Sequence, residues 1–315
     1  MTDIVVLRRG THGLPMDDYA AALRERLPER DVALARTPTE ERDLVADARV
    51  VTGCGIDEEL LDAAGGLELF ACAYAGYDHL PMAALRERGV AVTNAAGIHA
   101  PSIAEQVLGY VLTFARDLHE GLRRQQHREY RHYQARELQG STVTVVGMGA
   151  IGNAVVERLE GFGVSTIGVR YTPEKGGPTD EIVGFGDAEF HDALARTDYL
   201  VLATPLTETT RGLVDEAAFH TLPPESVLVN VARGGVVETD ALVAALRRQS
   251  IRGAALDVTD PEPLPEDHPL WNFENVLVTP HNAGHTPKHW DRLADVLAAN
   301  VPRLSDGRDL ENRVD

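Results

Sequence analysis

Three side chains in the second half of the sequence could perform acid–base chemistry on a carboxylic acid. Arg233 follows the apolar run 227–231 and precedes two glycines, and a guanidinium can hold a carboxylate through two hydrogen bonds. His281 follows the run 276–279, and histidine exchanges protons near neutral pH. Glu262 stands between two prolines, and a carboxylate beside the imidazole would orient the ring and favour its protonated form. Each could alone be an ordinary surface residue, but together they predict proton transfer to a carboxylate-bearing substrate.

A glycine-rich turn indicates what could react with that substrate. The β-branched run 142–146 leads into the sequence GMGAIG at 147–152, and a helical pattern follows. In this strand–turn–helix context the first glycine makes a tight turn, the second admits a pyrophosphate, and the third lets the helix pack close to the strand. The N–H groups and dipole of the helix N-terminus favour phosphate binding. The turn therefore predicts a dinucleotide site.

The next predicted strand indicates which dinucleotide is bound. An acidic residue at its end would accept a hydrogen bond from the ribose 2′-hydroxyl of NAD. Arg170 occupies that place, 18 residues after Gly152, and Tyr171 and Thr172 follow. A guanidinium fits a 2′-phosphate by charge and by its fork of donors. We therefore expect NADP(H) to be preferred, with NAD(H) as the weaker alternative.

Alternating apolar runs and amphipathic stretches predict βαβ units and parallel sheets. Helices are predicted between the strands, for example 16–27, 151–162 and 240–249, with a long helical stretch from 101 to about 124 and a further helix over 287–300. The predicted strands are 4–7, 49–52, 68–73, 90–93, 142–147, 165–170, 199–203, 227–231, 254–258 and 276–279. Because a long helix follows each set of strands, we expect an outer domain of residues 1–98 plus 288–315, interrupted by an inner domain of residues 99–287.

Composition limits the classes of partner. The 315 residues include 49 acidic and 30 basic side chains, a formal net charge of −19, which disfavours nucleic acid and anionic membranes. Only Lys175 and Lys288 are lysines, and acid excess with so little lysine predicts a protein adapted to a salty cytoplasm. The two cysteines, Cys54 and Cys72, form no metal motif or disulfide framework. His285 and His289 have the i, i+4 spacing of helical ligands, but no catalytic glutamate lies between them. We therefore expect no metal site.

The sequence resembles the D-isomer-specific 2-hydroxyacid dehydrogenase family, and its haloarchaeal members in particular. The resemblance covers nearly the whole chain. Besides the glycine turn and the Arg233, Glu262 and His281 segments, it rests on AYAGYDH at 73–79, NAAG at 94–97, IAE at 103–105, ELQG at 137–140, TPLT at 204–207 and the tail 312–315. The family's usual tyrosine–aspartate pair is here Val169-Arg170, which agrees with NADP(H).

The resemblance implies two Rossmann-like or flavodoxin-like domains, with the dinucleotide-binding domain inserted into the substrate domain, and a homodimer formed through the inner domains. It implies that Arg233 binds the substrate and that His281, paired with Glu262, is the acid/base. Backbone amides of Ala75 and Gly76 would help to hold the carboxylate, and Tyr74 would shape the side-chain pocket. The implied cofactor residues are Gly147, Gly149, Ala150, Ile151, Gly152, Arg170, Tyr171, Thr172, Thr204, Pro205, Thr209, Val231, Ala232, Asp257, His281 and Gly284.

The function expected is therefore reversible reduction of 2-keto acids to D-2-hydroxy acids with NAD(P)H. A glyoxylate or hydroxypyruvate reductase would use the same residues on a smaller substrate. A nucleotide-sensing binding protein of the same fold is the alternative from another class, and it would act through partner contacts.

Overall fold

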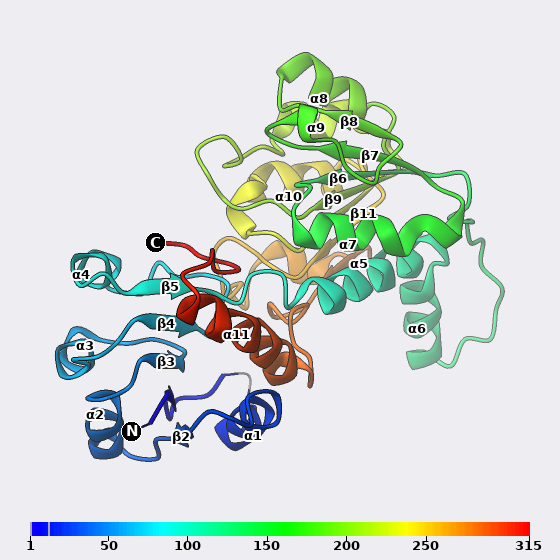
Figure 1. The fold of residues 1–315 in the computed structure, drawn as a ribbon. Helices are drawn as coiled ribbons and strands as arrows, with labels where there is room; N and C mark the ends of the chain where they lie inside the picture. Colours follow the sequence, from blue (N-terminus) through cyan, green and yellow to red (C-terminus); the bar gives the residue numbers. More distant parts are fainter. Residues whose placement is uncertain (1, 12) are drawn as a thin grey trace. The chain divides into compact units, whose positions relative to one another are not determined.

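The computed structural model describes residues 2–11 and 13–315. The chain divides into two compact units, one of Met1–His99 with His285–Asp315 and one of Ala100–Gly284. Each unit contains one parallel sheet with helices (Figure 1), so the predicted α/β class is confirmed. Among the described residues, no helix has the length and apolar character needed to cross a membrane.

The first unit has a five-stranded sheet in the order β2-β1-β3-β4-β5, and every neighbouring pair is parallel. This is the doubly wound order of flavodoxin-like folds. Its central strands are buried on both faces and therefore consist almost wholly of apolar residues. The strands are β1 (Ile4–Val6), β2 (Val32–Leu34), β3 (Val50–Gly53), β4 (Leu69–Cys72) and β5 (Ala91–Thr93). The helices are α1 (Met16–Arg26), α2 (Pro38–Val45), α3 (Glu58–Ala63), α4 (Met82–Glu87) and α11 (His289–Ser305).

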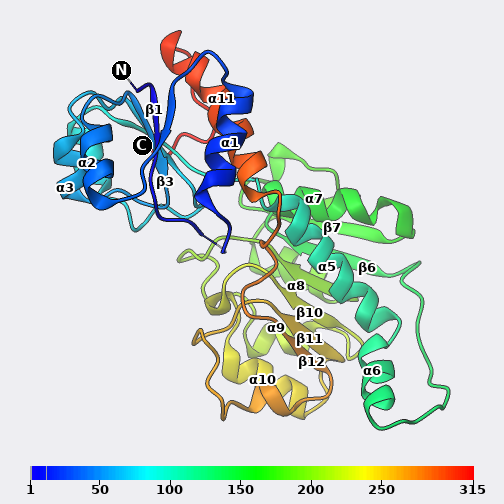
Figure 2. The same ribbon diagram turned by 90° about the horizontal axis from the view of Figure 1, so that it is seen from below.

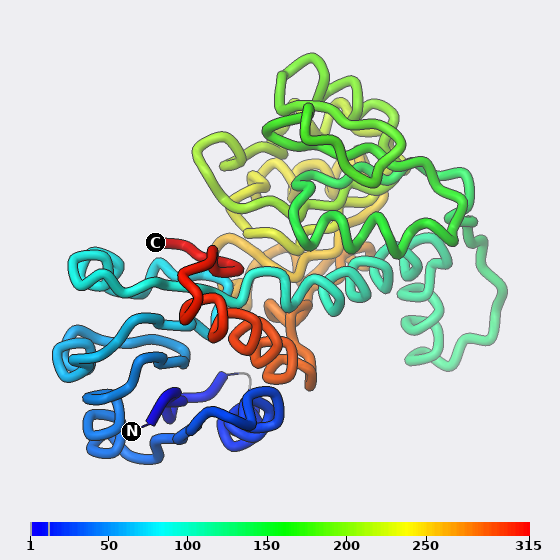
Figure 3. Tube along the Cα trace, in the orientation of Figure 1, coloured from blue at the N-terminus to red at the C-terminus, as the bar shows by residue number. Residues whose placement is uncertain are grey.

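The C-terminal segment belongs to this first unit. Helix α11 lies beside α1 (Figure 3). The ring of Trp290 stacks on that of Tyr19, with centroids 4.8 Å apart. Beyond α11, the N–H of Asn94 donates to the carbonyl of Asn312, and the N–H of Val314 donates to that of Val92. The last residues thus extend the hydrogen bonding of β5.

The second unit has a seven-stranded parallel sheet in the order β12-β11-β10-β9-β6-β7-β8 (Figure 2). The chain passes from β6 outward in one direction through β7 and β8, and then in the other through β9 to β12. This reversal of strand order creates a crevice at the carboxyl ends of β6 and β9, where ligands bind in open α/β sheets. The strands are β6 (Thr142–Val146), β7 (Ser165–Val169), β8 (Glu181–Val183), β9 (Tyr199–Leu202), β10 (Val227–Asn230), β11 (Gly253–Leu256) and β12 (Val276–Val278).

One helical stretch of the second unit differs from the prediction. The long helix expected from 101 to about 124 is two helices, because Asp117 adopts a left-handed backbone with φ of 48°. The Asp117 carboxylate accepts hydrogen bonds from Arg252 at 2.8 and 2.9 Å, and this half-buried ion pair holds the break. The helices are α5 (Ala100–Ala115), α6 (Leu118–Gln126), α7 (Ala150–Leu159), α8 (Asp187–Leu194), α9 (Glu216–Thr221) and α10 (Thr239–Arg247).

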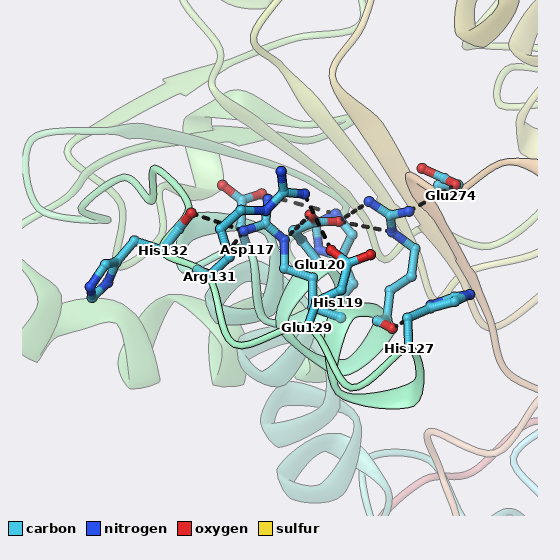
Figure 4. A network of polar contacts seen from close by, with 10 residues as sticks. Asp117, His119, Glu120, His127, Glu129, Arg131, His132 and Glu274 are labelled. Atoms are coloured by element: carbon cyan, nitrogen blue, oxygen red, sulfur yellow. Dashed lines mark hydrogen bonds and ion pairs between the residues drawn. The ribbon is translucent and has the colours of Figure 1, made fainter.

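A polar network fixes the irregular segment that follows α6. Glu120 accepts hydrogen bonds from the guanidinium groups of Arg123 and Arg124. Arg124 also donates to the carbonyls of Arg131 and His132, both at 2.9 Å, so α6 and residues 127–135 form one substructure (Figure 4). A cavity of about 710 Å³ lies between them.

The ten predicted strands are present, with ends that agree within two residues. The two that the prediction missed, β2 and β8, are three-residue edge strands. The last helix, predicted over 287–300, begins two residues later and continues to Ser305. Pro302 lies inside its final turn, which the sequence pattern does not indicate.

Candidate active site

The glycine turn between β6 and α7 has three different steric requirements. Gly147 has φ of 100°, and a Cβ there would lie 2.5 Å from the carbonyl oxygen of Ala203 at the end of β9. A Cβ on Gly152 would lie 2.0 Å from the carbonyl oxygen of Gly147. A Cβ on Gly149, by contrast, would meet no heavy atom within 4 Å among the described residues beyond its own chain neighbours. The first and third glycines are therefore needed for packing, and the second faces the open space that a pyrophosphate requires.

A cavity of about 640 Å³ opens at this turn. Eight of the sixteen cofactor residues that the resemblance implies line this cavity. Its lining consists of Gly147, Met148, Gly149, Arg170, Tyr171, Thr172, Lys175, Phe185, Ala203, Thr204, Pro205, Thr207, Glu208, Thr209 and Thr210. Ala150, Ile151 and Gly152 lie in the first turn of α7, next to this lining. The residues present therefore fit a dinucleotide.

Two cationic side chains, those of Arg170 and Lys175, follow β7, where an NAD site would carry a carboxylate. The backbone N–H of Arg170 donates to Val183 at 3.1 Å, and its guanidinium donates to the carbonyl of Gly176. Lys175 ends the short 3-10 helix Pro173–Lys175 and lines the same cavity. Lys175 was not predicted to lie at this site, although it is one of only two lysines in the chain. The acidic Glu208 lies in the lining as well.

The predicted catalytic residues come from three neighbouring strands. Asn230 at the end of β10 pairs with Leu256 of β11, which pairs in turn with Val278 of β12. The segments that carry Arg233, Glu262 and His281 therefore leave the sheet at one edge, which is also the edge of the glycine turn.

The imidazole of His281 is paired with Glu262. Its Nδ1 lies 2.7 Å from Glu262 Oε1, so Nε2 is the ring nitrogen left to face a substrate. About half of each side chain is exposed. His281 has φ of 51°, a left-handed conformation that costs a residue with a Cβ about 1–3 kcal/mol and persists only where surrounding contacts enforce it.

Asp257 supplies those contacts. Its side chain is only 3% exposed, and its carboxylate accepts hydrogen bonds from the N–H groups of Asn282 and Ala283 at 2.8 and 2.9 Å and from the Thr279 hydroxyl at 2.5 Å. Its backbone carbonyl accepts the N–H of His281 at 2.8 Å. The resemblance placed Asp257 only among the cofactor residues, whereas the structure shows that it holds the His281 loop.

Asn230 has a comparable position beside Arg233. The Asn230 side chain is 1% exposed; its amide donates to the carbonyl of Arg233 at 3.1 Å, and its oxygen accepts the N–H of Ala232 at 3.0 Å. A Cβ on Gly234 would lie 2.0 Å from the carbonyl oxygen of Thr259, so the two loops pack backbone to backbone. The Arg233 side chain is exposed and donates to the carbonyl of Ala232 at 2.6 Å. Asn230 was not predicted as a site residue, although a polar residue at the end of an apolar strand was a usable signal.

The predicted substrate residues of the first unit lie after β4. Ala75 and Gly76 are exposed, and the amide of Asn94 donates to the Ala75 carbonyl at 2.5 Å. Tyr74 is half-buried and lines a cavity of about 500 Å³ within this unit. Arg8, Arg9, Cys54 and His79 lie in the same lining.

A dinucleotide turn and an imidazole–carboxylate pair on one edge of a parallel sheet define the class of an α/β dehydrogenase. Residues 108–283 match the model of the D-isomer specific 2-hydroxyacid dehydrogenase NAD-binding domain. The chain therefore belongs to the D-isomer specific 2-hydroxyacid dehydrogenase family.

Individual relatives agree with this assignment. The chain is 34% identical to a glyoxylate reductase of Thermofilum pendens over 78% of this chain and 74% of the relative. It is 30% identical to a D-3-phosphoglycerate dehydrogenase of Methanocaldococcus jannaschii over 95% of this chain, but it spans only 58% of that relative. A crystal structure of a family member from Xanthobacter autotrophicus Py2, in complex with NADPH and MES, covers 100% of this chain and 98% of its own at 29% identity and a TM-score of 0.81.

Proposed function

We propose that the protein reduces 2-keto acids to D-2-hydroxy acids and prefers NADPH as the reductant. The observation that carries the proposal is the 2.7 Å pair of His281 and Glu262 at the sheet edge that also bears the glycine turn. An acid/base and a dinucleotide turn on one edge are the two parts that a carbonyl reduction needs.

Each residue has a definite task in this reaction. When bound, the reduced nicotinamide supplies the hydride that C2 of the keto acid receives. Arg233 holds the substrate carboxylate and polarises the carbonyl. His281 Nε2 holds the proton that passes to the carbonyl oxygen, while Glu262 fixes the ring through Nδ1 and stabilises its positive charge.

The preference for NADPH is supported by charge at the end of β7. Arg170 and Lys175 line the cavity where a 2′-phosphate would lie, and the residue expected to be acidic in an NAD site is Arg170 itself. The structure of the Xanthobacter autotrophicus relative in complex with NADPH supports this proposal. Tyr171 is 81% exposed, and we propose that it covers the adenine. The nicotinamide end would lie along Val231, Ala232, Asp257, His281 and Gly284.

The substrate side chain is assigned to the first unit by resemblance. We propose that Ala75 and Gly76 amides bind the substrate carboxylate and that Tyr74 limits the size of the side chain. Glyoxylate and hydroxypyruvate are the alternative substrates, a choice favoured by the similarity to the glyoxylate reductase of Thermofilum pendens.

We also propose that the protein is a homodimer in a salty cytoplasm. Helix α6 exposes 48% of Leu118 and 61% of Leu122, and Tyr130 in the following segment is fully exposed, so this substructure offers apolar surface to a second copy. The net charge of −19 supports adaptation to high salt.

Loss of nicotinamide absorbance in molar KCl tests the function. We would supply NADPH or NADH with a panel of 2-keto acids from glyoxylate to branched-chain acids. Rapid oxidation of NADPH, with D-2-hydroxy acid as the product, is the expected result. Oxidation of NADH alone would retain the reaction and overturn the cofactor preference. No oxidation of either by folded protein would overturn the proposed function in favour of nucleotide sensing.

A further inference from the structure

A chain of side-chain hydrogen bonds connects helix α5 to the loop that carries His281. The hydroxyl of Tyr110, on α5, is hydrogen-bonded to the hydroxyl of Thr279 at the end of β12. Thr279 Oγ1 donates to Oδ1 of Asp257 at 2.5 Å. Tyr110 is 5% exposed and Asp257 is 3% exposed, so this series of hydrogen bonds lies in the interior of the second unit.

The hydroxyl groups in this series can donate in only one direction, from Tyr110 through Thr279 to Asp257. An ionised carboxylate only accepts hydrogen bonds, so the single proton of the Thr279 hydroxyl is directed at Asp257. Tyr110 must then be the donor to Thr279. Burial raises the pKa of the Tyr110 hydroxyl, and the charge of Asp257 acts in the same direction, so the phenol retains its proton at neutral pH. Aligned donors of this kind polarise one another and strengthen the final bond.

The Asp257 end of this series of hydrogen bonds determines where His281 lies. The two oxygens of Asp257 hold the N–H groups of Asn282 and Ala283, directly after His281, and Thr279 lies two residues before it. His281 itself is in a left-handed conformation that the polypeptide would otherwise leave. The contacts that keep its ring 2.7 Å from Glu262 are therefore those of Asp257 and Thr279.

We propose that Tyr110 is a positioning residue for the reaction: through Thr279 and Asp257 it fixes the loop that presents His281. This proposal rests on the proposed function for its kinetic consequence, but not for its structural one. Helix α5 packs along α7 and so offers a rigid base for the chain.

Two substitutions test the proposal kinetically. Tyr110→Phe and Thr279→Val should each lower kcat about 3- to 10-fold without changing KM for NADPH. The kcat of the double variant should be no lower than that of Thr279→Val alone, because both substitutions break the same series of hydrogen bonds. Thr279→Ser, which keeps a hydroxyl, should retain most of kcat. Tyr199→Phe is the matched control, since Tyr199 is a 3% exposed tyrosine in β9 of the same unit.

Amide hydrogen exchange tests it without any substrate. Residues 281–284 should exchange several-fold faster in Tyr110→Phe than in Tyr199→Phe, at a temperature where both are folded. Faster exchange in a protein that reduces no keto acid would retain the positioning role and overturn only the proposed function. Unchanged exchange, equal kcat in the two tyrosine variants, or additive losses in the double variant would each overturn the proposal. If Tyr110→Phe does not fold, Thr279→Val against Thr279→Ser decides the outcome on the same readouts.

Discussion

Asp257 and His281 are joined through the main chain and not through their side chains. The N–H of His281 donates to the Asp257 carbonyl at 2.8 Å, while the Asp257 carboxylate holds the two residues that follow His281. A buried acid thus fixes the backbone of the proposed acid/base, and a separate, exposed acid, Glu262, contacts its ring. The structure therefore divides orientation of the loop and contact with the imidazole ring between two carboxylates.

Replacing His281 should abolish turnover and leave cofactor binding intact. In His281→Gln the substrate oxygen loses its proton donor, so kcat should fall about 10²- to 10⁴-fold. Steady-state kinetics and a fluorescence titration with NADPH measure the two effects. His220→Gln, on the exposed face of α9, is the control. A His281→Gln variant with near-normal kcat would refute the assignment.

Removing the carboxylate of Glu262 should narrow the active pH range on its alkaline side. Without that partner the protonated imidazole loses a charge-assisted hydrogen bond, so activity should begin to fall at a lower pH. We expect kcat of Glu262→Gln to fall about 10- to 100-fold at neutral pH. The measurement is a pH profile of kcat/KM, with the nearby exposed Glu266→Gln as control. An unshifted alkaline limb would show that Glu262 does not act on His281.

Arg170 should determine cofactor choice. Arg170→Ala should raise KM for NADPH about 10- to 100-fold and change KM for NADH little, because only the former carries the 2′-phosphate. Lys175→Ala should act in the same direction and more weakly, since lysine is a point charge. Arg247→Ala, an exposed arginine on α10, controls for loss of a cation. Equal losses with both cofactors would contradict a 2′-phosphate contact.

Salt should stabilise the protein by screening its own charge. At −19, repulsion between carboxylates opposes folding in dilute buffer, and molar KCl shortens the screening length to about 3 Å. The melting temperature should therefore rise from 0.05 M to about 2 M KCl. Sucrose, which carries no charge, separates screening from general solvent exclusion. Full stability without added salt would remove the idea of halophilic adaptation.

Neither thiol should take part in the chemistry. Burial raises the pKa of the Cys72 thiol to about 11 and raises that of Cys54 as well. A raised pKa leaves little thiolate at pH 8, so native protein should react slowly with a thiol reagent, and faster only at strongly alkaline pH. Unfolded protein is the comparison. Rapid labelling of Cys72 at pH 8 with loss of activity would contradict this prediction.

Local sequence signals were sufficient for much of the fold and for the chemistry-bearing side chains. Glycine spacing, β-branched runs and strand-end polar residues located the turn at 147–152 and the segments of Arg233, Glu262 and His281. Three features depended on tertiary contacts instead. The helix break at Asp117 is held by Arg252, 135 residues away in the chain, and the edge strands β2 and β8 form only by pairing with a neighbour.

The supporting residues were missed for a related reason. The bonds of Asp257 to the His281 loop follow from the pairing of β11 with β12. Asn230 bonds within its own loop, to Ala232 and Arg233, once that loop has folded back at the end of β10. Tyr110 has the spacing of a core residue on α5, and nothing local indicates that its hydroxyl reaches Thr279.

The second unit is one uninterrupted stretch, Ala100–Gly284, and its first and last turns are neighbours, since the Ser102 hydroxyl donates to the carbonyl of Gly284 at 3.4 Å. A segment whose ends meet can be inserted into a host fold without disturbing it. At the level of the gene, a single continuous block of codons therefore encodes the whole of the proposed dinucleotide site. Recombination could exchange that block between relatives and alter redox coupling while leaving the flanking coding sequence unchanged.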